Sequence, residues 1–428
     1  MVSSREMAKE FLRTHDLVFA SRPQLLGGKI IFYNCSDIVL SPYGDHWRQM
    51  RKICVMELLN PKLIRSFSSI RNDEIHRLLT HVRSSLGTPV NLSQRISLFM
   101  SSLICRSALG RVFTGREELI ELVDEMSALL GGFEFADVFP SLKFLHGLCG
   151  NKSKFLEVYH KTDAIIENII KQHEKNLESG NKGSGELGAD DIINVLIKLE
   201  RKGGLQLPIT HDIIKAIILD IFAGGTETSS TTVVWAMSEM MKHPRVFAKA
   251  QAEVREAFKG KEKLEEGDIE QLEYLKLVVK ETLRCHPPLP LLVPRECREE
   301  TIVYGCTIPQ KARVLINVWA IGRDPQYWKD PESFIPERFD NNNNNNSIDF
   351  MGNHFEFLPF GAGRRICPGL AFGFANTLFP LAHLLYNFDW KLPAGVTVET
   401  LDMSERPGMA VAKKNELFLI PTPPVSSC

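Results

Sequence analysis

A ten-residue stretch late in the chain constrains the fold more than any other feature. It spans residues 360–369 and reads Phe-Gly-Ala-Gly-Arg-Arg-Ile-Cys-Pro-Gly, so that three glycines and a proline surround Cys367. Glycine and proline let a backbone turn tightly and approach a bulky, flat ligand closely. A cysteine presented in this way can bind iron as a thiolate, because the metal removes the need for a thiol proton. The alternative is a buried structural cysteine, the commoner role of a single cysteine.

The spacing in this stretch, Phe-x-x-Gly-x-Arg-x-Cys-x-Gly, resembles the haem-binding loop of the cytochrome P450 family. The resemblance implies that Cys367 is the axial thiolate ligand of a haem iron, where it favours cleavage of the O–O bond of dioxygen. It also implies that Arg365 pairs with a haem propionate through its planar guanidinium. Phe360 and Gly369 complete the matching loop residues, and the implied cofactor is haem b.

Two further segments match the family pattern in the expected order. Glu281 and Arg284 lie three residues apart, where a carboxylate and a guanidinium on one helical face can meet. Such a pair is weak evidence alone, because surface helices carry many of them. The sequence Pro-Glu-Arg-Phe follows at 336–339, at the family's expected place. The resemblance implies that Arg338 closes a buried triad with Glu281 and Arg284 behind the haem loop.

A third match lies in a long apolar run at 213–240, which contains Gly-Gly-Thr-Glu-Thr-Ser at 224–229. Two glycines inside a helix cost roughly 1 kcal/mol each relative to alanine, so something should offset them. They permit either close helix packing or a local helix distortion that opens a groove for dioxygen. The run resembles the family's oxygen-binding segment, which implies that Thr228 is the oxygen-side hydroxyl and Glu227 its acidic partner in proton delivery.

Two segments offer further propionate-binding residues. Trp47 and Arg51 are four residues apart, so a helix places both on one face, with one indole donor and a fork of guanidinium donors. Taken alone, this pair fits an aromatic core residue beside a solvated basic face. The family resemblance implies instead that both residues bind a haem propionate. It implies the same role for Arg295, which follows the sequence His-Pro-Pro-Leu-Pro at 286–290.

The composition excludes several other classes of protein. The 428 residues include 51 Lys and Arg against 52 Asp and Glu, a balance that argues against a nucleic-acid binder. The nine cysteines are scattered without a C-x-x-C pair, so we expect no disulfide framework. The chain contains neither the apolar core of a signal peptide nor an apolar tract of the roughly 20 residues that cross a bilayer.

We therefore expect a mainly α fold with small β-sheets, in a single haem-enclosing domain over residues 1–428. Length alone suggests about three domains, but the implied haem-binding residues extend from Trp47 to Cys367. A capping box predicts that Ser3 is the N-cap of a first helix and Glu6 its N3 residue. The patterns predict further helices at 71–83, 154–177, 190–201, 211–243 and 245–258. They predict strands at 301–303, 312–318 and 417–420. They also predict two polar loops, one at 341–346 and one at 179–188, for which a domain linker is the alternative.

The nearest likeness is to plant-type microsomal members, in particular terpenoid hydroxylases, judged from the sequences at 41–52, 348–350 and 359–365. It implies a monooxygenase that inserts one atom of O2 into an apolar small molecule, a terpenoid or another plant specialised metabolite. By analogy, residues 27–33, 216–224, 291–293 and 407–411 line the pocket. No P-loop or dinucleotide-binding motif occurs, so electrons from NADPH must come from a partner. A flavoprotein reductase is implied, which would meet the basic residues Arg48, Lys52 and Arg364.

Family members of this type begin with a membrane-anchor helix, a proline-rich hinge and the first strands of a small sheet. We expect all three to be missing here, so that endoplasmic-reticulum residence on the cytosolic face is an expectation from the family alone. Two alternatives stay open. The chain could be a truncated, inactive paralogue that is not an enzyme, or it could catalyse a rearrangement or dehydration without external electrons.

Overall fold

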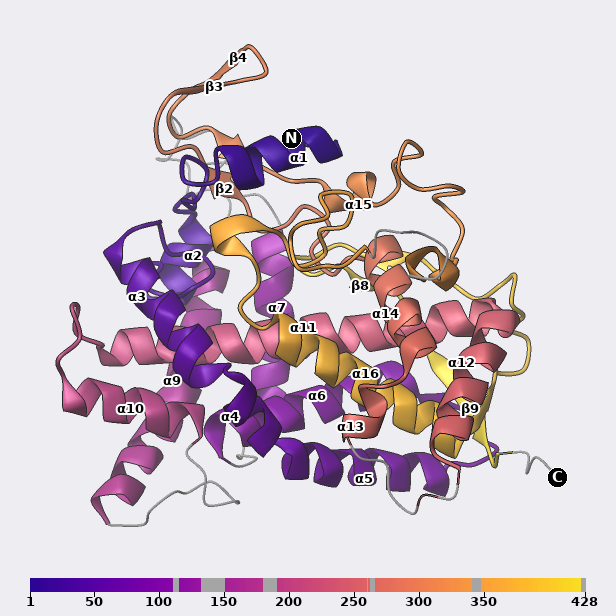
Figure 1. Ribbon diagram of the computed structural model, residues 1–428. Coiled ribbons are helices and arrows are strands. Elements are labelled where there is room, and N and C mark those ends of the chain that lie inside the picture. Colours follow the sequence, from indigo (N-terminus) through magenta and orange to yellow (C-terminus); the bar gives the residue numbers. More distant parts are fainter. Residues whose placement is uncertain are drawn as a thin grey trace.

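The computed structural model describes residues 1–110, 115–131, 151–179, 191–259, 261, 266–340 and 348–424. It confirms the expected mainly α fold with small β-sheets (Figure 1). The helical segments are α1 (Arg5–Lys9), η1 (Glu10–Thr14), α2 (Leu26–Ile31), α3 (Asp45–Ile53), η2 (Cys54–Leu58), α4 (Pro61–Ser66), α5 (Ser68–Ser84), α6 (Leu92–Leu109), α7 (Arg116–Gly131), α9 (Asn151–Glu178), α10 (Ile192–Lys202), α11 (His211–Lys242), α12 (Pro244–Ala257), α13 (Glu266–Ile269), α14 (Glu273–Cys285), α15 (Val318–Ile321), η4 (Pro336–Phe339), η5 (Gly363–Arg365) and α16 (Leu370–Asn387).

Helix α11 crosses the middle of the molecule and forms the centre of its core (Figure 1). The side chain of Thr210 caps its start, and Pro244 begins α12 just after it ends, a position that suits proline. The helix packs on α6, α14 and α16. It buries apolar residues such as Leu219, Phe222 and Trp235 along its length. A helix that is apolar on nearly all sides belongs in a protein interior, which accounts for its central position.

The strands are short and antiparallel. They are β1 (Val90–Asn91), β2 (Arg295–Glu296), β3 (Thr301–Val303), β4 (Cys306–Ile308), β5 (Arg313–Val314), β6 (Asp389–Lys391), β7 (Glu405–Arg406), β8 (Ala412–Lys413) and β9 (Phe418–Thr422). One sheet has the order β1-β9-β6, in which Leu419 pairs with Val90, and the other strands form the pairs β2-β5, β3-β4 and β7-β8. The strand predicted at 312–318 is shorter than expected, because the side chain of Asn317 caps helix α15.

The start of the chain differs by one residue from the predicted capping box. The N-cap of α1 is Ser4, whose hydroxyl accepts a hydrogen bond from the backbone N–H three residues on, at 3.4 Å. Val2 forms a parallel bridge with Ile316, which keeps the neighbouring Ser3 outside the helix. The prediction of Ser3 as N-cap with Glu6 at N3 was therefore wrong. A tertiary contact, which a capping pattern does not contain, determines where this helix begins.

The remaining sequence predictions concern the polar loops, the cysteines and a membrane span. The predicted polar loop at 341–346 lies outside the described residues, as does the one at 179–188 beyond its first residue. The described cysteines are all free thiols. Among the described helices, none combines the length and the apolar character that a membrane span requires.

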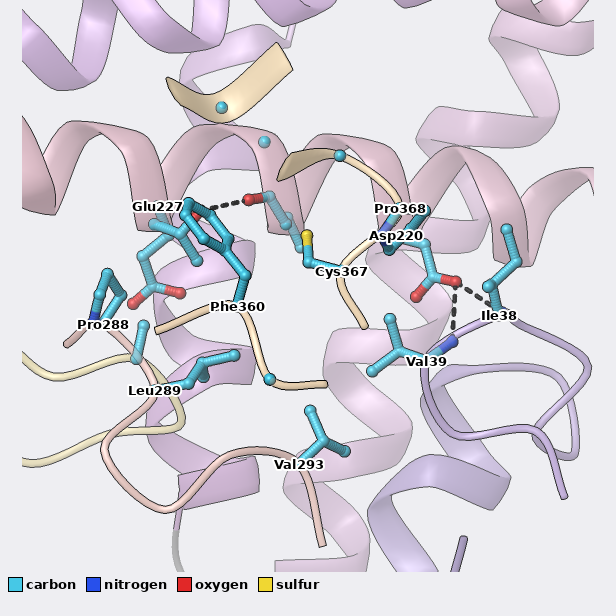
Figure 2. A pocket seen from close by; sticks show the side chains of 18 of the residues that line it. Ile38, Val39, Asp220, Glu227, Pro288, Leu289, Val293, Phe360, Cys367 and Pro368 are labelled. Carbon is cyan, nitrogen blue, oxygen red and sulfur yellow. Dashed lines mark hydrogen bonds between the residues drawn. The ribbon is translucent and has the colours of Figure 1, made fainter. Parts of the chain in front are cut away.

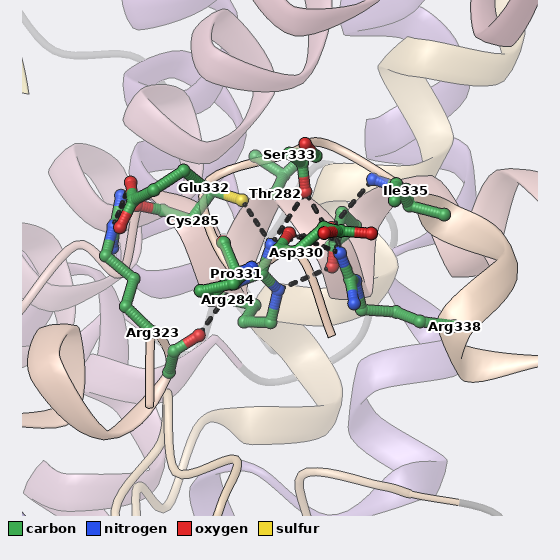
Figure 3. Close-up of polar contacts among 12 residues, drawn as sticks. Thr282, Arg284, Cys285, Arg323, Asp330, Pro331, Glu332, Ser333, Ile335 and Arg338 are labelled. Carbon is green, nitrogen blue, oxygen red and sulfur yellow. Dashed lines mark hydrogen bonds and ion pairs between the residues drawn. The ribbon is translucent and has the colours of Figure 1, made fainter. Parts of the chain in front are cut away.

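A buried ionic network joins α14 to η4 (Figure 3). Arg284 donates two hydrogen bonds to the carboxylate of Glu281, at 2.7 and 2.8 Å, and Arg338 donates a third at 2.9 Å. The side chains of Glu281 and Arg284 are fully buried, and that of Arg338 is 10% exposed. Arg284 also donates to the backbone carbonyls of Gly322 and Pro331, each at 2.7 Å. The network thus fastens the segment before η4 to α14.

Replacement of Glu281 by glutamine should destabilise the fold strongly, because two arginines would lose their buried carboxylate partner. We expect a loss on the order of 3–5 kcal/mol in the free energy of unfolding. The exposed pair Glu273–Lys276 on the same helix provides the control, and Lys276→Gln should cost less than about 1 kcal/mol. Urea denaturation followed by tryptophan fluorescence measures both. Equal losses in the two variants would contradict the structural role of the network.

Candidate active site

An internal cavity of about 300 Å³ lies between α11 and the loop at 360–369 (Figure 2). Its walls are mainly apolar, and the few polar groups come from separate parts of the chain. Each of the four stretches expected to line a pocket contributes to it: Phe32 from the first, Asp220, Ile221, Ala223 and Gly224 from the second, Leu292 and Val293 from the third, and Met409 and Ala410 from the fourth.

Cys367 lies on the wall of this cavity, as Phe360 and Gly369 do (Figure 2). The loop that carries them turns at Gly361 and Gly363, whose φ angles of 71° and 69° lie in the left-handed region that favours glycine. The backbone N–H of Cys367 donates to the carbonyl of Phe360 at 3.0 Å and closes the turn. Burial raises the pKa of the Cys367 thiol, while the backbone N–H of Gly369 and the charge of Arg51 oppose that shift.

Four arginines line the same cavity: Arg22, Arg51, Arg295 and Arg365. The pKa of each guanidinium is lowered, chiefly by burial, and the pKa of Arg365 falls to about 9. Arg365 donates from Nε to the carbonyl of Ala20 at 2.7 Å. Three of these arginines were expected from the sequence, whereas Arg22 was missed. No motif marks Arg22, and only the folded chain brings it to the cavity.

The hydrogen-bond donor of Trp47 has a partner within the chain, whereas those of Arg51 have none among the described residues. The indole N–H of Trp47 donates to the carbonyl of Ile38 at 3.1 Å, so it is already satisfied within the chain. Within the described residues, no hydrogen bond or ion pair of Arg51 is recorded, although its side chain is half-buried in the cavity wall. A guanidinium that is partly removed from water and has free donors favours an anionic partner. Since three further buried arginines line the same cavity, this part of it suits the carboxylates of a large, otherwise apolar ligand such as haem.

Two buried carboxyl groups lie beside these arginines. Oδ2 of Asp220 accepts hydrogen bonds from the backbone N–H groups of Ile38, at 2.7 Å, and Val39, at 3.3 Å (Figure 2). Burial and the neighbouring Asp37 raise the pKa of Asp220 well above its usual range, and burial raises that of Asp37 to about 6. Neither residue was expected in the site. The available signal was that Asp220 interrupts an otherwise apolar run.

The two glycines of α11 have different neighbours. A Cβ atom added to Gly225 would lie 2.8 Å from Cδ1 of Ile104 on α6, so this glycine permits close helix packing. A Cβ atom added to Gly224, which lines the cavity, would meet nothing within 4 Å. Close helix packing thus accounts for Gly225, whereas Gly224 lies against open space in the cavity. Residues 211–242 form one continuous α-helix, so no break in the helix opens the cavity.

Glu227 and Thr228 both line the cavity but have separate partners. The hydroxyl of Thr228 donates to the carbonyl of Gly224, one turn earlier, at 2.6 Å. The Glu227 carboxyl accepts a hydrogen bond from the hydroxyl of Ser127 on α7, at 2.9 Å. Burial raises the pKa of Glu227 to about 7, with the Ser127 hydrogen bond as the largest opposing cause. A carboxyl group with this pKa exchanges protons readily at neutral pH.

Comparison with known proteins agrees with these features. A family model for cytochrome P450 matches residues 1–420. Premnaspirodiene oxygenase of Hyoscyamus muticus is 60% identical over 423 residues, which cover 99% of this chain and 83% of that protein. The 5-epiaristolochene 1,3-dihydroxylase of Nicotiana tabacum is 59% identical over 425 residues, with the same two coverages of 99% and 83%. A zebra fish cytochrome P450 structure with progesterone has a TM-score of 0.82 at 23% identity, over 99% of this chain and 93% of that one.

The fold and the matches define a haem-dependent oxidoreductase that acts on small molecules with dioxygen and electrons from a redox partner. The chain belongs to the cytochrome P450 family, and it is a monooxygenase. The family and enzyme class expected from the loop at 360–369 are thereby confirmed.

Replacement of Asp220 by asparagine tests whether the buried carboxyl pair shares a proton. Both pKa values are raised, so the folded chain binds protons more tightly than the unfolded chain, and the pair stabilises the fold most at low pH. That contribution is lost as the pH rises through about 6, the value for Asp37, and beyond. As the pH rises from about 5 to 8, the urea midpoint of the wild type should fall, and we expect the midpoint of Asp220→Asn to fall by a smaller amount.

The exposed Asp212 on the same helix supplies the control for this measurement. Asp212→Asn should keep the pH dependence of the wild type. An unchanged pH dependence in Asp220→Asn would show that the two buried carboxyl groups do not bind the proton that their raised pKa values indicate.

Proposed function

We propose that this monooxygenase inserts one oxygen atom into an apolar terpenoid, with Cys367 as the ligand of the haem iron. The observation that carries the proposal is the position of the Cys367 thiol in a mainly apolar cavity that four arginines and the Glu227–Thr228 segment also line. The apolar walls suit a hydrocarbon-rich substrate, which gains free energy by leaving water. The names of two relatives refer to premnaspirodiene and 5-epiaristolochene as the compounds that are oxidised.

The residues of the cavity fit haem b. Arg51, Arg295 and Arg365 are proposed to hold its propionates, and Arg22 lines the same cavity. Trp47 would join them by exchanging its hydrogen bond to the Ile38 carbonyl for one to a propionate. Haem ligated by a thiolate activates dioxygen for insertion of one atom into the substrate. The N–H of Gly369 and the charge of Arg51 both favour the thiolate form of Cys367, which is the form that binds iron.

Glu227 and Thr228 are proposed to manage protons on the opposite side of the reacting centre. The Thr228 hydroxyl is held one helical turn from Gly224, where the cavity is open to a ligand. Glu227, with a pKa of about 7, is proposed to supply the proton that this hydroxyl delivers. This hydroxyl and acid pair favours oxygen insertion over a rearrangement or dehydration, which needs no proton supply to dioxygen.

The electron donor is proposed to be an NADPH-dependent flavoprotein reductase. Arg48 and Lys52 on α3 are exposed to solvent, while their neighbours Trp47 and Arg51 line the cavity. Arg364 is likewise exposed beside the buried Arg365. Exposed cations on the elements that carry the haem-binding residues suit an acidic partner, because complementary charge speeds encounter. Residence at the endoplasmic reticulum membrane rests on the family resemblance alone.

The first test is replacement of Cys367 by alanine. We expect the reduced carbon monoxide complex of the wild type to show thiolate-type absorption, and we expect Cys367→Ala to lose it because the sulfur ligand is gone. Cys105→Ala removes a buried thiol of α6 outside the cavity and should leave the spectrum unchanged. Haem content, measured beside the spectrum, separates loss of the ligand from loss of the fold. A thiolate-type spectrum in Cys367→Ala would overturn the assignment.

The second test is replacement of Thr228 by alanine. Without its hydroxyl, dioxygen should leave as hydrogen peroxide instead of entering the substrate, and the peroxide formed per NADPH consumed should rise several-fold. Thr228→Ser should restore most of the coupling. Thr231, which is buried on the same helix but does not line the cavity, provides the control, and Thr231→Ala should stay coupled. Full coupling to product in Thr228→Ala would contradict the proton-delivery role.

A further inference from the structure

Ser127 on α7 lines the cavity and connects three parts of the chain. Its hydroxyl donates to Oε1 of Glu227 at 2.9 Å and accepts from the backbone N–H of Ala410 at 3.4 Å. Its backbone carbonyl accepts from the N–H of Met409 at 2.9 Å. The side chain is buried, with the residue 6% exposed. Helix α7, the central helix α11 and the turn at 408–410 therefore meet at one serine.

The contacts give the Ser127 hydroxyl a definite direction. A serine hydroxyl has one proton to donate and lone pairs to accept. Because the N–H of Ala410 points at the oxygen, the hydroxyl proton is left for the Glu227 carboxyl. A hydrogen bond donated to a carboxyl oxygen favours the ionised form. Ser127 thus both orients the Glu227 carboxyl and biases its ionisation.

The wall that carries Ser127 is tightly built. A Cβ atom added to Gly131, the last residue of α7, would lie 2.3 Å from the carbonyl carbon of Gly408. A Cβ atom added to Gly408 would lie 2.8 Å from the carbonyl oxygen of Ala410. Two backbones in such close contact cannot shift independently. Helix α7 and the turn at 408–410 thus form one wall, and the Ser127 hydroxyl ties the Glu227 carboxyl to it.

We propose that Ser127 is a positioning residue, which holds the Glu227 carboxyl against the wall formed by α7 and the turn at 408–410. The proposal rests on the proton-delivery role proposed for Glu227. It makes the ionisation of the acid depend on the same serine that joins α7 to the turn at 408–410. Ser127 does not itself exchange a proton with substrate or dioxygen.

Two charged side chains among the described residues influence Glu227. Asp124 on α7 raises the pKa of Glu227 by like-charge repulsion, and Arg406 on β7 lowers it. Burial raises that pKa most, and the hydrogen bond from Ser127 is the largest opposing influence, so that the balance is about 7. Loss of the Ser127 hydroxyl leaves burial less opposed. The pKa of Glu227 should therefore rise in Ser127→Ala.

The test is a pH titration of Ser127→Ala in two readouts. Infrared difference spectroscopy of the resting holoenzyme follows the carboxyl band that disappears in Glu227→Gln. Product formed per NADPH consumed, with reductase supplied, follows coupling. We expect the midpoint of both profiles to rise by about one to two pH units, since a hydrogen bond to a charged group contributes about 1.5–3 kcal/mol and one unit corresponds to 1.36 kcal/mol. Ser127→Thr keeps the hydroxyl and should retain the wild-type midpoints.

Val123→Ala provides the matched control. Val123 is buried on α7, one turn before Ser127, and does not line the cavity. A loosened helix should lower the thermal midpoint of unfolding in both alanine variants but move the titration only in Ser127→Ala. If Ser127→Ala folds poorly, Ser127→Cys, a weaker donor of similar size, should give an intermediate shift.

Two results would overturn different claims. Suppose that the carboxyl group titrates in Ser127→Ala as it does in the wild type, and that Glu227→Gln alters the coupling profile. This result would refute the positioning role of Ser127 and leave the proton-delivery role of Glu227 standing. An unaltered coupling profile in Glu227→Gln would refute the proton-delivery role of Glu227, while the infrared midpoint in Ser127→Ala would still decide whether the serine controls the acid. Equal shifts in Val123→Ala and Ser127→Ala would assign the effect to packing and also refute the positioning role.

Discussion

Three buried guanidinium groups and the half-buried one of Arg51, which line one cavity with the Cys367 thiol, set the main physical constraint on this structure. Taking a cation out of water costs several kcal/mol unless partners replace its hydration. The chain supplies many of those partners as backbone carbonyls, since Arg22, Arg295 and Arg365 each donate to carbonyl oxygens of nearby turns. The carbonyl oxygens of those turns therefore point toward the guanidinium groups. Among the described residues, Arg51, the fourth, has no hydrogen-bond or ion-pair partner, which is why it is proposed to bind a carboxylate of the ligand.

Helix α11 connects this cation-rich region to the rest of the cavity. Asp220 binds the loop at 38–39, whose carbonyl at Ile38 in turn accepts from both Trp47 and Arg365. Two turns further along the helix, Glu227 is held by the wall that carries Ser127. The loop at 38–39, which contacts two of the residues proposed to hold haem, and the groups proposed to handle protons are therefore linked through one helix. A substitution that displaces Asp220 should also shift Glu227 on the same helix.

The helices predicted at 71–83, 154–177, 190–201, 211–243 and 245–258 could be found from sequence because of their apolar periodicity, whereas α6 and α16 were not among the predicted ranges. The interval 211–243 was predicted as a helix, and the structure has His211–Lys242. Short elements were harder, since one tertiary contact decides them. The bridge of Val2 to Ile316 moves the first N-cap to Ser4, and the cap at Asn317 shortens a predicted strand.

The candidate site could be predicted where its residues fall in contiguous motifs, as Cys367 and Arg365 do. Arg22 and Ser127 could not be found in this way. Arg22 gains its role from a carbonyl 271 positions away, and Ser127 from a carboxylate 100 positions away. Neither residue has a local pattern that distinguishes it from an ordinary surface arginine or helical serine. Asp220 is intermediate, because a lone carboxylate in an apolar run is visible in the sequence but its partners are not.

X-ray absorption at the iron edge of the purified, haem-loaded protein tests the central claim most directly. The account predicts one sulfur ligand to iron in the wild-type protein, contributed by the thiolate of Cys367. An iron shell composed only of nitrogen and oxygen atoms would contradict it, and the cavity would then have to serve some other ligand.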